Sequence, residues 1–186
     1  MLTRRLFTLS ALLPLNARAT ELAQALYAPN YVLLMRHAYA PGVGDPPNYT
    51  LDRCEGQRLL NDEGRRQAVR NGDWLRQQGV QRATVLSSAW CRCTETATLL
   101  GFGGFKVEAS LASFFDAPSR AISQTSALRE LLASALPSKG DRALILVTHH
   151  VNIAEFTGEN IGSGDMVLAH IGPYGQLLDF RRYPSL

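Results

Sequence analysis

The sequence has little of what marks a membrane protein or a small disulfide-stapled protein. Only 3 of its 186 residues are cysteine, 8% are aromatic and 19% are charged. No stretch approaches the roughly 20 apolar residues that a membrane-spanning helix needs, and we find no internal repeat or low-complexity tract. With 46% apolar residues, the chain has the composition of a globular protein and the length of one domain.

The first 19 residues have the block order of an export signal. Arg4 and Arg5 precede a short apolar run over residues 6–15, and residues 17–19, Ala-Arg-Ala, have the small-residue spacing that a signal peptidase recognises. The arginine pair followed by Leu-Phe resembles a twin-arginine signal. The alternative is a basic amphipathic helix that stays on the protein. We expect residues 1–19 to direct export to the periplasm or the medium, and residues 20–186 to form a single domain.

The charge pattern gives no sign of nucleic-acid binding. Residues 1–19 carry three of the 19 Lys and Arg residues and no acid, so 16 basic and 16 acidic residues remain in the domain. The formal charge of +3 therefore belongs to the signal segment. A nucleic-acid binder needs a basic face, and the domain contains no Lys/Arg cluster that predicts one.

Short apolar runs alternate with helical patterns along the domain. Residues 31–35 and 143–147 are continuous apolar runs typical of strands buried on both faces. Further strands are expected at 83–86, 105–107, 166–168 and 176–180, and helices at about 61–79, 90–100, 119–136 and 151–156. The apolar stripes predicted for two of these helices are Ala68, Val69, Trp74 and Leu75, and Ile122, Ala127, Leu128, Leu131 and Leu132. This order predicts an α/β fold, a three-layer α/β/α sandwich with a mostly parallel central sheet.

Basic and imidazole side chains follow three of the predicted strands. Arg36 and His37 follow the first strand, Arg92 follows the second, and His149 follows the run at 143–147. Parallel strands end along one edge of a sheet, where ligands bind. A neutral imidazole is a competent nucleophile when its other nitrogen is held by a hydrogen bond, and guanidinium groups match phosphoryl oxygens with paired donors. The pattern predicts phosphoryl transfer at this edge.

Four segments resemble the histidine phosphatase superfamily. Residues 34–38, Leu-Met-Arg-His-Ala, resemble its Arg-His-Gly signature, and residues 60–68 resemble its Leu-x-x-x-Gly-x-x-Gln-Ala segment. Residues 87–97 are similar to its Ser-x-x-x-Arg-x-x-x-Thr-Ala element, and residues 147–149 to the strand end that carries a second histidine. The segments occur in family order over about two-thirds of the chain. The resemblance implies that His37 forms a transient phosphohistidine, that Arg36, Arg92 and His149 surround the phosphoryl group, and that no metal or organic cofactor takes part.

The chain also departs from this pattern. Ala38 replaces the usual Gly after the nucleophile, and His150 stands where Gly is common. The general acid is not fixed by the motifs: Asp116 is the first candidate, Asp165 the second, and a substrate with a good leaving group needs little help from an acid. In the loop at 38–60 and beside His149, the expected substrate contacts are Asn48, Gln57, Arg58 and His150.

The three cysteines allow more than one arrangement. In an oxidising compartment, Cys54 can pair with Cys91 or with Cys93. A metal site built from Cys91, Cys93 and the two adjacent histidines lacks the ligand spacing of structural zinc.

Several functions remain open at this level. The first is an exported phosphatase acting on a small phosphomonoester or a phosphorylated envelope component. The alternatives are a mutase, a phosphohistidine-protein phosphatase, and a non-catalytic module that binds phosphoryl groups. The oligomeric state is not predictable from the sequence.

Overall fold

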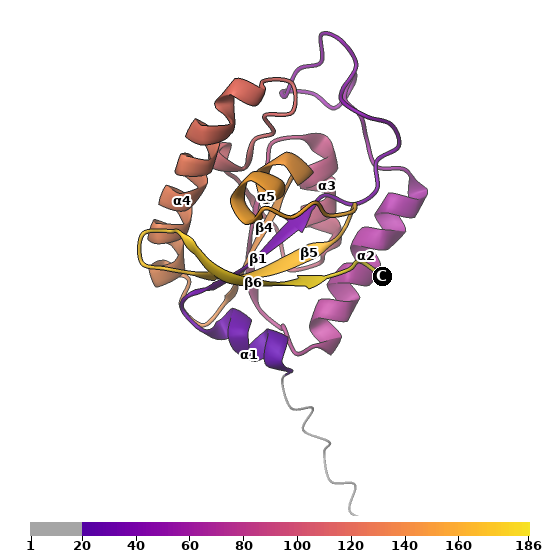
Figure 1. Ribbon diagram of the computed structural model, residues 1–186. Helices are drawn as coiled ribbons and strands as arrows, with labels where there is room; N and C mark the ends of the chain where they lie inside the picture. Colours follow the sequence, from indigo (N-terminus) through magenta and orange to yellow (C-terminus); the bar gives the residue numbers. More distant parts are fainter. Residues whose placement is uncertain (1–19) are drawn as a thin grey trace, which may run out of the picture.

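A six-stranded sheet runs through the centre of the part of the chain that the computed structural model describes, residues 20–186 (Figure 1). The predicted export signal lies outside the described residues. The strands lie in the order β3-β2-β4-β1-β5-β6, with β1 Tyr31–Arg36, β2 Ala83–Ser87, β3 Lys106–Val107, β4 Ala143–Thr148, β5 Met166–Ile171 and β6 Leu177–Tyr183. The strands β3, β2, β4 and β1 are parallel, and β5 and β6 add two antiparallel pairings at one side. The mostly parallel sheet that the sequence predicts is confirmed.

Helices cover both faces of the sheet. They are α1 Glu21–Tyr27, α2 Asp62–Gln77, α3 Cys91–Leu99, α4 Ala121–Ser138 and α5 His150–Thr157, with short 3₁₀ turns at Ala109–Leu111 and Pro118–Arg120. One buried cluster joins α1, α2 and α3 to the sheet, and a second joins α4 and α5 to its other face. Successive strand residues point to opposite faces, so Leu33 belongs to the first cluster and Leu34 to the second. This is the predicted three-layer sandwich.

Two residues placed in the predicted apolar stripes are exposed instead. The buried positions of α2 include Ala68 and Leu75, whereas Val69 is 40% exposed. A residue directly after a buried one lies about 100° further round a helix, which turns Val69 to solvent. Ile122, 83% exposed, lies off the stripe of α4 that Leu128 and two further leucines form.

Local sequence explains where α2 begins. Asn61 caps α2, its side chain accepting a hydrogen bond from the Gly64 N–H at 2.9 Å. Gly64 has no side chain for a reason that the packing shows: a Cβ there would lie 1.9 Å from the Tyr39 carbonyl oxygen. The start of α2 is thereby packed directly against the chain that leaves β1.

Candidate active site

A cavity of about 220 Å³ opens at the edge of the sheet where the parallel strands end. Arg36, His37, Arg92 and His149 all line it, although they come from three separate segments of the chain. They arrive from the ends of β1 and β4 and from the first turn of α3. The loop from 38 to 60 rises over this edge, at the top of Figure 1, and contributes part of the cavity lining. The structure therefore brings together the four residues that the sequence places at one edge.

His37 forms the floor of the cavity and is only 1% exposed. Its Nδ1 lies 2.8 Å from the Ala38 carbonyl oxygen. A carbonyl accepts only, so Nδ1 carries the proton and donates it. Burial, followed by the nearby Arg92, lowers the pKa of His37 well below its usual value. The ring is therefore neutral, and the lone pair of Nε2 is available for nucleophilic attack.

Helix α3 is hydrogen-bonded to the backbone that follows His37. The Ala38 N–H donates to Thr96 Oγ1 at 3.0 Å, and the Thr96 hydroxyl donates to the Arg92 carbonyl at 2.6 Å. One side chain thus connects the backbone after His37 to the turn that carries Arg92. The family element with Thr four residues after Arg has a physical basis here, because that spacing places both groups on one helix face.

His149 is 2% exposed, and its ring packs against that of His37 with centroids 5.5 Å apart. Its Nε2 lies 2.9 Å from Ser88 Oγ and 3.5 Å from Cys93 Sγ. Burial raises the pKa of the Cys93 thiol to about 12, so the thiol keeps its proton. Burial also lowers the pKa of His149 well below its usual value. A neutral ring that accepts at Nε2 carries its proton on Nδ1, which leaves that N–H free to donate to an anion.

Both predicted arginines keep unused hydrogen-bonding capacity. Arg36 donates from Nη1 to the Ile161 carbonyl at 2.9 Å, and Arg92 donates from Nη1 to Asp45 at 2.8 Å. The Nε atoms of both residues are buried without a partner in the described chain. Buried guanidinium donors are seldom left unpaired. Their place in the cavity wall makes them suited to the oxygens of a phosphoryl group.

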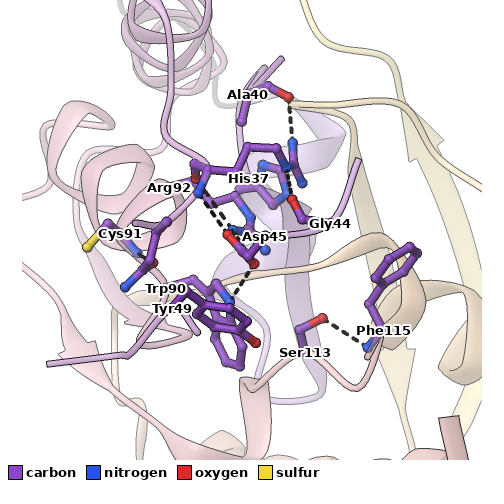
Figure 2. Close-up of polar contacts among 12 residues, drawn as sticks. His37, Ala40, Gly44, Asp45, Tyr49, Trp90, Cys91, Arg92, Ser113 and Phe115 are labelled. Atoms are coloured by element: carbon purple, nitrogen blue, oxygen red, sulfur yellow. Dashed lines mark hydrogen bonds and ion pairs between the residues drawn. The ribbon is translucent and has the colours of Figure 1, made fainter. Parts of the chain in front are cut away.

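Asp45 is the site residue that the sequence analysis missed. Figure 2 shows its carboxylate between the Arg92 guanidinium and the Trp90 indole. Both side chains of the Asp45–Arg92 ion pair are almost fully buried, at 2% and 4% exposure. Arg58 lines the cavity beside this pair and is held by the carbonyl groups of Gly44 and Ala40. No motif or periodicity pointed to Asp45, because it lies in an irregular loop.

The rim of the cavity comes from two exposed segments. Asp116 lines it, and one of its carboxylate oxygens accepts a hydrogen bond from the Tyr49 hydroxyl at 3.2 Å. Phe115 and His150 also line it, with ring centroids 5.6 Å apart. The rim residues Asp116 and Phe115 therefore lie on a loop, and His150 begins α5.

Three residues proposed from the sequence lie outside the cavity lining. Asn48 is exposed, with a left-handed backbone at φ 65°. Gln57 is buried and holds other parts of the loop, accepting from the Cys91 N–H at 2.9 Å. Asp165 accepts hydrogen bonds from the backbone N–H groups of Gly162 and Ser185. Gln57 and Asp165 are engaged in hydrogen bonds elsewhere, and Asn48 is exposed to solvent. Asp116, Arg58 and His150, by contrast, do line the cavity.

A disulfide ties the loop to α3. Cys54 is bonded to Cys91, the first residue of the helix that carries Arg92, and Cys93 is the free, buried thiol. This decides between the two pairings that the sequence left open. Within residues 20–186, no three His, Cys, Asp or Glu side chains are grouped so that they could hold a metal ion. None of the helices in the same range has the length and apolar character that crossing a bilayer requires.

The two buried imidazoles make a prediction about stability in mild acid. Their pKa values are lowered in the folded protein and return to about 6.5 in the unfolded chain. Below that pH the unfolded state binds protons that the folded state does not, so stability falls as pH falls. Between pH 7.5 and 5.5 we expect a loss of roughly 1 kcal/mol per imidazole. Urea unfolding in phosphate-free buffer measures it, and a His149→Asn variant should lose less; an equal loss in that variant would contradict the assignment.

The chain is similar to known proteins in sequence and in fold. Residues 32–111 match the family model for the histidine phosphatase superfamily (branch 1). The structure is similar to a mycobacterial glucosyl-3-phosphoglycerate phosphatase solved with VO3, at 17% identity and TM-score 0.60, covering 82% of this chain and 97% of that one. It is also similar to the protein histidine phosphatase SixA complexed with tungstate, at 18% identity and TM-score 0.54, covering 83% and 96%. An Entamoeba histolytica phosphoserine phosphatase has TM-score 0.54 at 12% identity, covering 81% and 95%. A search of curated protein sequences returns no match.

Proposed function

The chain belongs to the histidine phosphatase superfamily, and on that premise we propose that it hydrolyses a phosphomonoester through a phosphohistidine formed on His37. The observation that carries the proposal is the convergence of two neutral imidazoles and three guanidinium groups on one small cavity. Such a site supplies a nucleophile and stabilises the charge on the phosphoryl oxygens, which is most of what phosphoryl transfer requires of a protein.

The reaction has two steps. The Nε2 lone pair of His37 attacks phosphorus, the bond from phosphorus to the ester oxygen breaks, and the alcohol leaves with a proton. Water then attacks the phosphohistidine, gives up a proton, and releases inorganic phosphate and free His37. Arg36, Arg92 and the Nδ1–H of His149 neutralise the phosphoryl oxygens in both steps.

Asp116 is the residue we assign to proton transfer. It lines the cavity and is exposed, and the other carboxylate in the cavity lining, Asp45, is paired with Arg92. Asp116 donates the proton to the departing oxygen and takes one from the attacking water. The Tyr49 hydroxyl that donates to Asp116 holds the carboxyl group in place.

We propose that the substrate is a small phosphorylated compound or a phosphorylated component of the cell envelope. Two observations support a location outside the cytoplasm. The first 19 residues have the block order of an export signal, and the Cys54–Cys91 bond is of a kind that persists in oxidising compartments. Fractionating cells that express the full chain should recover it in the periplasm or medium. An Arg4→Lys, Arg5→Lys variant should remain in the cytoplasm, and recovery of both proteins there would refute export.

Turnover of p-nitrophenyl phosphate by the purified, oxidised protein tests the function. We expect saturable release of p-nitrophenol, inhibited competitively by orthovanadate because that anion occupies the phosphoryl site. A screen of phosphorylated metabolites with the same protein then identifies preferred leaving groups. Protein that binds phosphate but releases none from any ester would be a phosphoryl-binding module, and the enzyme proposal would fail.

A further inference from the structure

The Asp45 carboxylate lies where an anionic substrate has to bind, and all its contacts are with donors. Oδ1 accepts from Arg92 Nη1 and from the Arg58 N–H, each at 2.8 Å. Oδ2 accepts from Trp90 Nε1 at 3.1 Å and from Arg92 Nη1 at 3.1 Å. A buried carboxylate is costly unless it is paired and hydrogen-bonded in this way. These four hydrogen bonds fix the position of the Asp45 carboxylate relative to Arg92.

The charge of the cavity depends on this residue. Three guanidinium groups line it, those of Arg36, Arg58 and Arg92. Asp45 is the buried carboxylate among them, since Asp116 lies at the exposed rim. The deep part therefore has an excess of two positive charges, and a phosphomonoester carries about two negative charges at neutral pH. Without Asp45, the cavity would have an excess of three positive charges. It would then favour a more highly charged ligand and bind the phosphate product more tightly.

Asp45 also sets which donors of Arg92 face a substrate. Both carboxylate oxygens take the Nη1 group, so rotation of the guanidinium plane is restricted. The Nε–H of Arg92 has no partner in the described chain. The Nε–H of Arg92 is therefore the donor that is available to a phosphoryl group, because Asp45 binds the Nη1 group.

We propose that Asp45 is a positioning and specificity-determining residue: it orients Arg92 and reduces the cavity charge to the value that matches one phosphoryl group. It thereby favours monoesters over ligands with two adjacent phosphoryl groups and limits inhibition by the phosphate product. Asp45 acts through Arg92, since its oxygens are engaged with protein donors. The inference rests on the proposed function, whose site it deepens.

Calorimetric titration of inorganic phosphate into the wild type and Asp45→Asn tests the charge argument. Removing one negative charge a few ångströms from the anion should tighten phosphate binding about tenfold. Asp52→Asn is the matched control: it removes the same charge at an exposed position of the same loop, outside the cavity lining, and should change the dissociation constant by less than about twofold. Asp45→Glu keeps the charge and should restore phosphate affinity to near the wild-type value even where packing around the loop changes.

Kinetics supply the second readout. In Asp45→Asn we expect kcat for p-nitrophenyl phosphate to fall, because Arg92 is held less well, while KM also falls. The preference for p-nitrophenyl phosphate over inorganic pyrophosphate should shrink about tenfold. A purely structural role would lower kcat and weaken phosphate binding together, and that result would overturn the inference.

The outcomes separate the two proposals. If the wild type hydrolyses no ester but Asp45→Asn binds phosphate more tightly, the proposed enzymatic function is refuted and the proposed charge role of Asp45 stands. If the wild type is active but Asp45→Asn binds phosphate no more tightly than the wild type, only the proposed charge role of Asp45 is refuted. Wild type that binds no phosphate would overturn both. Circular dichroism confirms that each variant is folded before its titration is interpreted.

Discussion

Replacing His37 with alanine is expected to lower kcat for p-nitrophenyl phosphate by about 10³-fold or more, since loss of a nucleophile from a catalytic site removes the covalent pathway. The structure makes the effect specific to one atom. Nδ1 is fixed by the Ala38 carbonyl, and burial keeps the ring neutral, so the reactive lone pair of Nε2 has no substitute at that point. The Nε2 of His149 contacts Ser88 and Cys93, so we do not expect it to replace His37 as the nucleophile.

The control for this variant is a histidine outside the cavity. His170 in β5 stacks on Tyr31 and contacts Asn30, so His170→Asn should keep kcat within a few-fold of the wild type. Rapid quenching of the wild type during turnover should also trap phosphate on the protein in an acid-labile, alkali-stable form. Full activity in His37→Ala, or labelling that survives in it, would show that the nucleophile has been assigned wrongly.

Removing the Cys54–Cys91 bond is expected to lower the free energy of unfolding by about 2–4 kcal/mol. The bond spans 37 residues, and closing a loop of this length restricts the unfolded chain more than the folded one. A Cys54→Ser, Cys91→Ser variant should therefore unfold at a markedly lower urea concentration. Activity should fall as well, because the same loop supplies Asp45 and Arg58 to the cavity.

Reductant provides an internal check on that result. Dithiothreitol should destabilise the wild type by a similar amount and leave the double serine variant unchanged. Cys93 is buried beside His149 and remains a thiol in both proteins, so it does not confuse the comparison. If reductant leaves the unfolding curve of the wild type unmoved, the bond contributes nothing measurable to stability.

The parts of the site that could be predicted are those whose position follows from the sheet. Apolar runs identify β1 and β4, and parallel pairing then brings the residues after each run to one edge. His37 and His149 follow from that argument alone. Arg92 follows because α3 begins directly beyond β2. Local pattern and long-range geometry agree at these positions, so the sequence predicts where these residues lie.

Asp45 could not be found by the same argument. It lies in an irregular loop, where neither periodicity nor a capping signal indicates the direction of a side chain. Its partners, Arg92 and Trp90, are more than 40 positions away, and only the folded loop brings them within reach. The pairing of Cys54 with Cys91 could not be predicted for a similar reason. Cys91 and Cys93 lie in one turn of α3 and are almost equally far from Cys54 in the sequence. Asn48, chosen for its polarity, turns out to be exposed outside the cavity lining.

The separation between a floor of strand ends and a rim of loops has a consequence for how this protein can change. The floor residues continue from β1 and β4, whose strands are almost wholly buried, and amide hydrogens in such strands exchange slowest with solvent. The rim around Val43 and Phe115 is exposed and contributes little to the two cores. A library randomised at the rim should therefore yield variants with new leaving-group preferences that fold as well as their parent, because surface loops accept substitution at small cost.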